Sequence, residues 1–422
     1  MKNIFGLAFQ SWRARRISVF LSIGVIALSV GLLLSIEQLR RSVRNSFAQT
    51  ISGTDLIVGA RGGSTELLLY SVFHIGSAAA NVKYSTYERF QENPRVNWLI
   101  PISLGDSHKG FRVVGTNGAF FKHFKYRKDR QLTFSNGEQF KGTFDVVLGS
   151  EVARRLSYKV GDKLVLSHGV SSGEAIFDHG DKPFTVTGIL ENTGTPVDKS
   201  LYVTLAGIEA IHIDWAQGVP PMEGEEITAQ EVLEMNLKIK NISAFYVGLR
   251  SKLDILRIQR DINTLTAEPL SAILPTLELN RLWETVSYAE GALRIISILV
   301  IAVSLVSMLI AVYSSLQQRR REIAILRAVG ASSGVIFSLF FLDSLLMTVT
   351  GSILGFFLSY AGLAAAVPVL DQAAGILIEL GPPTVTELGF LGAVLLMGFL
   401  VGLFPAWRAY KNTLLDGLTI KF

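Results

Sequence analysis

Histidine and aspartate side chains lie close together in one glycine- and serine-rich stretch of the chain. Imidazole and carboxylate groups are common ligands of transition metals, which makes His168, Asp178 and His179 the candidates for a metal site. Their spacing matches no standard metal-binding motif, and solvated loop residues of these types are far more common. The other histidines, His74, His108, His123 and His212, are scattered along the chain. We therefore predict no metal site, and His168, Asp178 and His179 are only weak candidates for metal ligands.

Several motifs for other reaction chemistry are missing. The sequence contains no G-x-x-x-x-G-K-[ST] phosphate loop, so it cannot bind ATP by that route. It also contains no H-E-x-x-H. The absence of cysteine excludes disulfides, thiolate zinc sites and cysteine nucleophiles. We predict that the chain is not an enzyme on its own and that it binds no cofactor.

Long apolar segments dominate the composition. Only 18% of the 422 residues are charged, whereas a soluble domain has about 25%. A helix needs about 20 mostly apolar residues to cross the hydrocarbon of a bilayer. Residues 17–36, 295–316, 335–370 and 388–407 meet this requirement. The predicted fold class is an α-helical membrane protein with four transmembrane helices (1 + 3) and a large mixed α/β extracytoplasmic domain between helices 1 and 2.

Basic residues predict how these spans are oriented. Short loops that carry an excess of lysine and arginine stay in the cytoplasm. Segments 1–16, 317–334 and 408–422 are rich in bases, whereas the loop 371–387 has acids and no base. Both termini and residues 317–334 are therefore expected in the cytoplasm, and residues 37–294 outside it. The net charge of +5 is explained by these flanking segments, so we expect no nucleic-acid partner.

Within the spans, one acid and two pairs of glycines could have special roles. Asp343 lies in the third span, where an acid is functional by default. The alternative is an interfacial position in which its carboxylate reaches headgroup water. Gly351 and Gly355, like Gly398 and Gly402, have the small-x-x-x-small spacing that allows close helix approach. The contact could lie within the chain or between two copies.

The segment 319–331, RRREIAILRAVGA, combines an apolar face with several charges. Ile323, Leu326 and Val329 share one side of a helix, and bases and one acid lie beside them. This pattern predicts a short amphipathic cytoplasmic helix that ends at Gly330. Its apolar face could cover an anionic lipid surface or contact a protein.

The large domain 37–294 shows strand patterns that alternate with helical ones. We expect strands at 55–58, 111–114, 146–148, 163–166, 184–190, 200–203 and 244–249. Helices are expected at 86–91, 150–156 and 253–265, and an exposed loop at 207–226. Helical stalks at 40–49 and around 279–293 would continue into the first two spans. The amphipathic N-terminal segment 1–16 is expected along the inner leaflet.

Several of these motifs resemble a known family. The run R-R-E-I-A-I-L-R-A-V-G-A, followed by an apolar span with Asp343, is similar to the hallmark of FtsX/MacB-like ABC permeases, also called type VII or mechanotransmission transporters. The end of the fourth span, from Gly402 to Ala409, resembles their P-A-x-x-A ending, although the tail that follows departs from the pattern. Residues 53–59, 147–156, 160–163 and 184–190 resemble the MacB-type periplasmic core domain.

The resemblance implies a permease subunit in the bacterial inner membrane, with a coupling helix in 317–334 seated in a groove of a separate ATPase. The implied coupling residues are Arg320, Arg321, Glu322, Ile323, Leu326, Arg327, Gly330 and Ala331. ATP and Mg would bind to the ATPase dimer and not to this chain. Further implied partners are a second copy or a paralogous permease, and a periplasmic or lipoprotein partner.

The resemblance implies two kinds of output. The first is export, or the handling of a lipoprotein or periplasmic substrate, driven by movement of the outer domain. The alternative is a transmembrane signalling switch that controls an extracytoplasmic enzyme such as a cell-wall hydrolase. A receptor outside the ABC class is disfavoured, because residues 317–334 are too few to form an output module.

Overall fold

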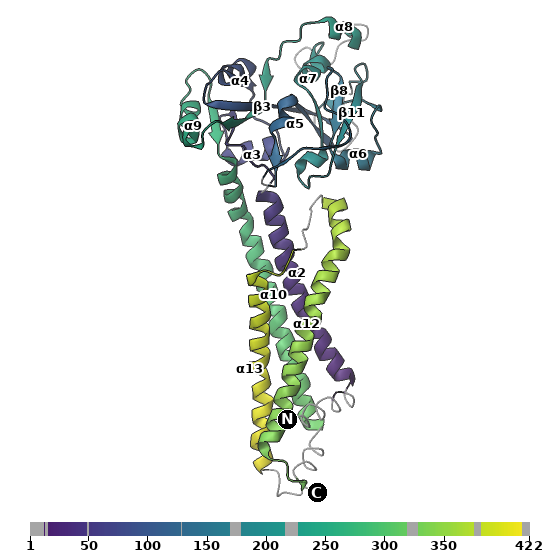
Figure 1. Ribbon diagram of the computed structural model, residues 1–422, viewed down its shortest axis with the longest axis vertical. Helices are drawn as coiled ribbons and strands as arrows, with labels where there is room; N and C mark the ends of the chain where they lie inside the picture. The colour runs from purple at the N-terminus through teal and green to yellow at the C-terminus, as the bar shows by residue number, and fades with distance from the viewer. Residues whose placement is uncertain are drawn as a thin grey trace. The chain divides into compact units, whose positions relative to one another are not determined.

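The fold is described from a computed structural model (Figure 1). The structure describes residues 12, 16–48, 50–127, 129–168, 179–215, 227–318, 328–374 and 381–415. The chain divides into two compact units. The helical unit comprises Met1–Ser42, Val286–Gln372 and Ile378–Phe422, and the sheet unit comprises Val43–Thr285 with Ala373–Leu377.

Long helices make up the described part of the helical unit (Figure 1). They are α2 (Arg16–Ala48), α10 (Pro275–Gln318), α12 (Ser333–Ala374) and α13 (Val385–Leu415). Stretches long and apolar enough to cross a membrane are Arg16–Ser42, Ser333–Val367 and Val385–Leu403. In α10 the apolar run is shorter, Gly291–Val303. The described residues thus contain three candidate spans, and the fourth, 295–316, stays a prediction.

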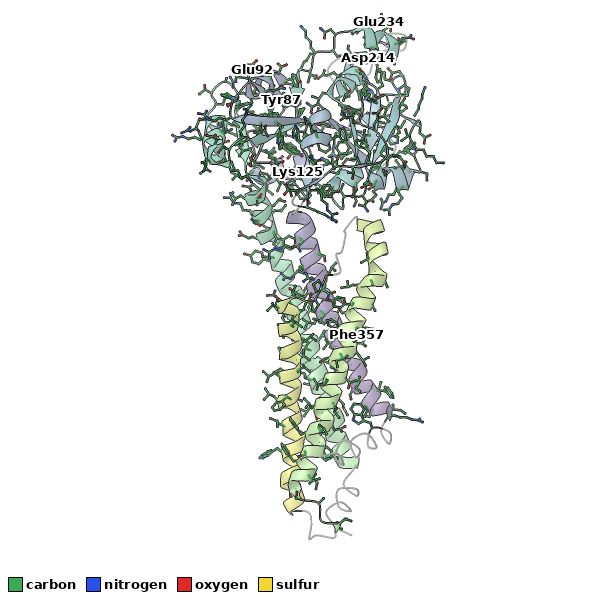
Figure 2. The ribbon with its side chains drawn as sticks, in the orientation of Figure 1. Tyr87, Glu92, Lys125, Asp214, Glu234 and Phe357 are labelled. Atoms are coloured by element: carbon green, nitrogen blue, oxygen red, sulfur yellow. The ribbon has the colours of Figure 1, made fainter. Side chains whose placement is uncertain are left out.

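The side chains of these helices separate into an inner and an outer set. Ile26, Phe340 and Val394 pack together in the interior of the unit. Phe20 on α2 and Phe357 on α12 (Figure 2) are large apolar side chains that remain exposed. Extended apolar surfaces of this kind mark contact with lipid or with another apolar partner, which agrees with helices that cross a membrane.

The framework of the sheet unit is an eleven-stranded mixed sheet. In spatial order its main path is β15 (Leu270–Ile273), β1 (Leu56–Ala60), β14 (Ala244–Leu249), β3 (Val96–His108), β4 (Phe111–Thr116), β12 (Ser200–Thr204), β8 (Asp145–Leu148), β11 (Phe184–Leu190) and β7 (Phe134–Gly137). Off this path, β10 (Ser167–His168) pairs with β3, and β9 (Lys163–Leu164) pairs with β11. Two small separate pairs are β2 (Val82–Lys83) with β13 (Asn241–Ile242), and β5 (Lys125–Tyr126) with β6 (Arg130–Gln131).

The long strand β3 joins the two halves of this sheet. Its first part pairs with β14 and its second part with β4. The register with β4 shifts between Leu104 and Ser107, where β3 contains one residue more than its partner. Such a bulge bends a strand and changes the direction of its side chains. Asp106 lies inside this bulge.

Helices cover both faces of the sheet. Successive strand residues point to opposite faces, so Ile57 of β1 joins one buried cluster while its neighbours Leu56 and Val58 join another. The first face packs against α3 (Ser64–Val72) and α5 (Gly118–His123). The opposite face packs against α4 (Tyr84–Gln91), α9 (Ile255–Asn263), α6 (Ser150–Leu156) and α7 (Leu205–His212). The remaining short elements are α8 (Ala229–Glu234), η1 (Pro196–Lys199) and η2 (Lys252–Asp254).

All seven strands predicted from the sequence are present, with ends shifted by at most two residues. The helix predicted at 150–156 matches α6, and that at 86–91 lies within α4. The loop predicted at 207–226 is wrong at its beginning, because α7 extends to His212. Thr204 caps this helix by accepting a hydrogen bond from the Gly207 N–H. In the sequence, the glycine three residues after this threonine favours a loop and hides the start of the helix.

Candidate functional site

Asp343 is almost fully buried inside the helical unit. The indole N–H of Trp12 donates a hydrogen bond to its Oδ1 over 2.6 Å. A buried carboxylate is costly unless such a donor satisfies it. The bond joins a residue ahead of α2 to the first half of α12, so a change at Asp343 would affect both segments.

The four predicted glycines all lie at close helix contacts within the chain. A Cβ added at Gly351 would lie 2.7 Å from Ile26 Cγ2, and one at Gly355 would lie 2.6 Å from the carbonyl oxygen of Ala27. These two glycines bring α12 against α2. In the same way, a Cβ at Gly398 would lie 2.4 Å from Thr348 Cγ2, and one at Gly402 would lie 2.7 Å from Ser344 Cβ. The second pair brings α13 against α12.

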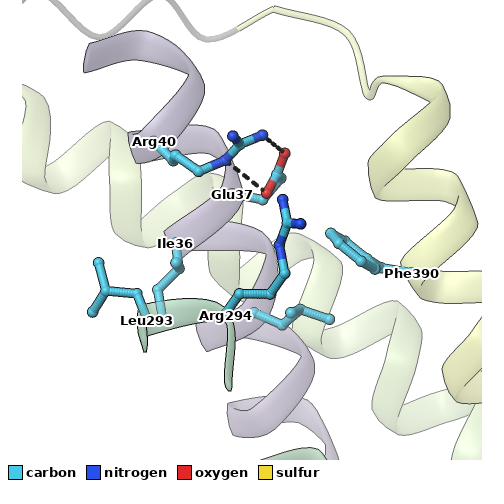
Figure 3. A pocket seen from close by; sticks show the side chains of 7 residues that line it. Ile36, Glu37, Arg40, Leu293, Arg294 and Phe390 are labelled. Atoms are coloured by element: carbon cyan, nitrogen blue, oxygen red, sulfur yellow. Dashed lines mark hydrogen bonds and ion pairs between the residues drawn. The ribbon is translucent and has the colours of Figure 1, made fainter. Parts of the chain in front are cut away.

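Charged side chains near one end of these helices are paired. Arg40 Nη2 donates to Glu37 Oε1 over 2.6 Å, and Arg41 Nη2 lies 3.6 Å from Glu387 Oε1. A small pocket beside the first pair (Figure 3) is lined by Leu33, Ile36, Glu37, Arg40, Leu293, Arg294 and Phe390. The first pair lies within one turn of α2, and the second links α2 to α13.

Most of the predicted coupling residues, from Arg320 to Arg327, lie outside the described residues. Gly330 and Ala331 are described and lead into α12. Gly330 has a φ of +97°, a backbone conformation that residues other than glycine rarely adopt. Val329 beside it is 84% exposed. The glycine therefore forms the turn that starts α12.

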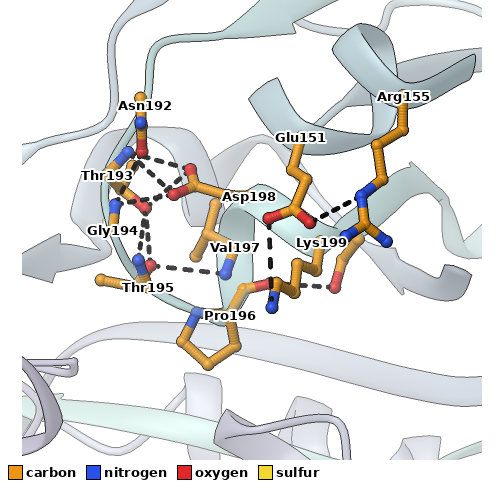
Figure 4. A network of polar contacts seen from close by, with 11 residues as sticks. Glu151, Arg155, Asn192, Thr193, Gly194, Thr195, Pro196, Val197, Asp198 and Lys199 are labelled. Carbon is orange, nitrogen blue, oxygen red and sulfur yellow. Dashed lines mark hydrogen bonds and ion pairs between the residues drawn. The ribbon is translucent and has the colours of Figure 1, made fainter. Parts of the chain in front are cut away.

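In the sheet unit, the loop between β11 and β12 folds around the carboxylate of Asp198 (Figure 4). This carboxylate accepts the backbone N–H groups of Thr193 and Gly194 over 2.9 and 2.6 Å, and the Thr193 hydroxyl over 2.9 Å. Burial raises the pKa of Asp198, although these hydrogen bonds oppose the effect. A Cβ at Gly149 would lie 2.3 Å from the carbonyl oxygen of Val197. The motif 147–156 thus packs directly against this loop.

The same motif also contributes a charged contact to the loop. Glu151 of α6 lies 3.1 Å from Arg155 and 4.0 Å from Lys199, atom to atom, although its side chain is nearly inaccessible (Figure 4). These contacts hold the loop against α6 and β12. The role of Glu151 and Asp198 is therefore structural.

Two of the three metal candidates, His168 and His179, lie together with two residues that the sequence did not indicate. Asp106 and His212 complete the group, whose potential ligand atoms all lie within 4.8 Å of one another. His168 Nδ1 lies 3.3 Å from Asp106 Oδ1 and 3.1 Å from His212 Nε2. His212 Nε2 lies 3.5 Å from the same Asp106 oxygen. The third candidate, Asp178, lies outside the described residues.

Burial and mutual charge shift the pKa values of this cluster. Burial opposes ionisation of Asp106, but the neighbouring histidines outweigh it and lower its pKa to about 2. Burial lowers the pKa of His179 to about 4, and the charge of His212 adds to this effect. For His212, burial acts downward, but Asp106 raises its pKa above the ordinary value. The group thus combines a carboxylate with imidazoles of very different basicity.

Two known protein families match this chain, one over its first two thirds and the other over its last third. The family described as "MacB-like periplasmic core domain" matches residues 19–265, which is more than half of the 422 residues. The family described as "FtsX-like permease C-terminal" matches residues 294–414. The chain belongs to the FtsX/MacB-like ABC transporter permeases.

Solved structures similar to this permease include two outer domains. The periplasmic region of MacB from Actinobacillus actinomycetemcomitans is 12% identical, with 56% of this chain and 94% of that chain covered and a TM-score of 0.33. The extracellular domain of the noncanonic ABC-type transporter YknZ from Gram-positive bacteria is also 12% identical, with 52% and 98% covered and a TM-score of 0.31. The curated proteins contain no sequence match.

Proposed function

We propose that this permease couples ATP hydrolysis on a separate cytoplasmic ATPase to movement of its sheet unit outside the cytoplasm. The observation that carries the proposal is the presence of both family regions in one chain that has no phosphate loop of its own. The energy for movement then has to come from a nucleotide-binding partner. The residues that face this partner are proposed to be those of the 320–331 segment.

Helices α2 and α10 are suited to transmit such movement. Each contributes residues to both units without a break in the helix. The 44 residues of α10 extend over about 66 Å at a rise of 1.5 Å per residue. Since a continuous helix resists compression along its axis, a displacement at one end reaches the other.

The proposed output is export, or the handling of a lipoprotein or another periplasmic substrate. The size of the sheet unit supports this proposal, since a pure switch could work with a much smaller outer domain. Two copies of the permease, or one copy and a paralogue, would assemble with two ATPase subunits. The termini would lie in the cytoplasm, and the helical unit would lie in the inner membrane of a bacterium.

The test is co-purification from native membranes through an affinity tag on this chain. We expect an ATPase that carries a phosphate loop, together with a second permease copy, and ATP hydrolysis by the assembled complex. The isolated chain should hydrolyse no ATP above background. Robust turnover by the isolated chain, or a complex without any nucleotide-binding subunit, would contradict the proposal. Recovery of a cell-wall hydrolase in place of a transport partner would favour the signalling output.

A further inference from the structure

We propose that Asp106, His168, His179 and His212 form a binding site for one divalent transition-metal ion, and that Zn²⁺ fits this site best. The four residues come from separate segments of the sheet unit and present one carboxylate and three imidazoles to a common point. This inference is independent of the proposed coupling to an ATPase.

The distances between the ligand atoms fit a tetrahedral ion. Zn²⁺ binds imidazole nitrogen and carboxylate oxygen at about 2.0–2.1 Å, which puts two ligand atoms at the tetrahedral angle about 3.3–3.4 Å apart. The three separations among Asp106 Oδ1, His168 Nδ1 and His212 Nε2 are 3.1, 3.3 and 3.5 Å. The three atoms thus form one face of a tetrahedron of the required size.

The tautomer of His212 leaves its Nε2 without a proton and able to bind a metal ion. His212 Nδ1 lies 2.8 Å from the carbonyl oxygen of Ile208. Because a carbonyl only accepts, Nδ1 must carry the proton, and in the neutral ring Nε2 then presents a lone pair. The neighbours of this nitrogen are His168 Nδ1 at 3.1 Å and an Asp106 carboxylate oxygen at 3.5 Å. Two acceptors in this arrangement repel each other unless a proton or a metal ion lies between them.

Buried polar atoms of the cluster also lack partners. Both carboxylate oxygens of Asp106 and both ring nitrogens of His179 are buried and have no hydrogen-bond partner among the residues that the structure describes. Each of these residues is 1% exposed. An unpaired polar atom in such a place costs about 1–3 kcal/mol. A bound cation would satisfy the carboxylate and one nitrogen of His179 together.

The fold holds the four residues in place before any ion binds. The bulge in β3 contains Asp106, and His168 of β10 is its direct cross-strand neighbour. His212 ends α7, and the backbone N–H of His179 donates to Leu166 over 2.9 Å. Ligands that the surrounding structure already positions need little ordering when the ion binds.

The charges and rings around the cluster tolerate a cation. Lys182 is a buried base three residues after His179. Its ammonium group is paired with Asp181 and, over 2.8 Å, with Asp214, which follows α7 (Figure 2). Trp215 packs on His179 with ring centroids 4.6 Å apart. This indole shields the site on one side, while the His168 side chain, 43% exposed, leaves an entry for the ion.

The type of ligand selects the class of metal. Mg²⁺ and Ca²⁺ prefer sites made of oxygen ligands, and only one of the four residues here offers oxygen. Imidazole suits Zn²⁺, Cu²⁺, Ni²⁺ and Co²⁺, and the tetrahedral spacing favours Zn²⁺ among them. The competing explanation is an ion pair between protonated His212 and Asp106. That pair would satisfy those two residues but would leave the buried nitrogens of His179 unpaired.

The test uses the full-length permease in detergent, purified with a tag that lacks histidine and stripped of metal with a chelator. We expect one Zn²⁺ to bind per chain with a Kd below about 1 µM, and neither Mg²⁺ nor Ca²⁺ to compete. Co²⁺ should give the intense visible absorption of a four-coordinate ion. X-ray absorption of the Zn²⁺-loaded wild type should show three imidazole ligands.

Substitutions then identify the ligands. Asp106→Asn and His212→Gln should each weaken Zn²⁺ binding by more than about 100-fold. The matched control His123→Gln, whose ring stacks on Trp98 away from the cluster, should bind as the wild type does. The proposal is wrong if the folded wild type shows no saturable Zn²⁺ binding, if its X-ray absorption spectrum shows fewer than three imidazoles, or if the cluster variants bind Zn²⁺ as tightly as His123→Gln.

Discussion

His74 is buried in the sheet unit, with its Nδ1 2.7 Å from Ser200 Oγ. Burial lowers the pKa of His74 to about 4, and the charge of Arg112 adds to the effect. In an unfolded chain the pKa of histidine is about 6.5. Between these two values the unfolded chain binds more protons than the folded one, so the free energy of unfolding falls as the pH is lowered through this range.

We therefore predict that His74→Asn removes part of the acid sensitivity of the sheet unit. Asparagine tolerates the positive φ of 56° found at this position. Between pH 7 and pH 4.5 the wild type should lose about 2 kcal/mol more unfolding free energy than the variant. Denaturant titrations at both pH values, with a chelator present, measure this difference. Parallel losses in the two proteins would show that His74 does not titrate as stated.

Only part of the candidate metal site could be predicted from the sequence. His168 and His179 stand out because they flank one short stretch. Asp106 and His212 do not, because their proximity depends on a strand bulge and on the end of a helix in a stretch predicted to be a loop. Sequence spacing indicates metal ligands well when they share one turn or helix, and poorly when separate strands bring them together.

Strands with an uninterrupted side-chain pattern can be predicted from this sequence, whereas a strand with an interrupted pattern cannot. The β14 segment, Ala244–Leu249, is buried along its whole length and was predicted with the correct bounds. The central strand β3 was not predicted, because Pro101 disfavours a strand interior and the bulge breaks the alternation of side chains. In the fold, Pro101 still contributes its carbonyl oxygen, which accepts from the Thr116 hydroxyl over 2.7 Å.

Two glycines of α12 allow a matched test of helix packing. A Cβ at Gly355 would lie 2.6 Å from the backbone of Ala27, whereas a Cβ at Gly362 would meet nothing within 4 Å. Gly355→Ala should therefore force α2 and α12 apart and destabilise the helical unit by about 1–3 kcal/mol. Gly362→Ala should be neutral or slightly stabilising, because alanine favours a helix. Thermal unfolding in detergent compares the two variants, and equal melting temperatures would exclude the close contact.

The orientation of the chain in the membrane is a prediction that cysteine labelling can test. Because the sequence has no cysteine, single cysteines can be introduced without a background. Leu253 of the sheet unit is 94% exposed, and Val329 beside α12 is 84% exposed.

We expect Leu253→Cys to react with a membrane-impermeant maleimide in cells whose outer envelope alone is opened. Val329→Cys should react only after the inner membrane is permeabilised. Labelling of Val329→Cys in sealed cells would overturn the predicted topology, and with it the position of the coupling segment.

The central claim, that residues 320–331 couple this permease to an ATPase, depends on an apolar face flanked by charges. A groove in a protein would require Glu322 individually, because losing one partner of a buried charged hydrogen bond costs about 2–5 kcal/mol. Binding to anionic lipid would depend on the number of bases, at about 1 kcal/mol each, and an acid would oppose it. One substitution therefore separates the two explanations.

The deciding measurement is ATP hydrolysis and ATPase retention by membranes that carry Glu322→Lys, compared with a variant in which Arg319, Arg320 and Arg321 are replaced by glutamine. We predict that Glu322→Lys inserts at the wild-type level but loses the ATPase and the hydrolysis that depends on it. If Glu322→Lys keeps an active complex while loss of the three arginines detaches the segment from the membrane, this segment binds lipid and the coupling claim is wrong.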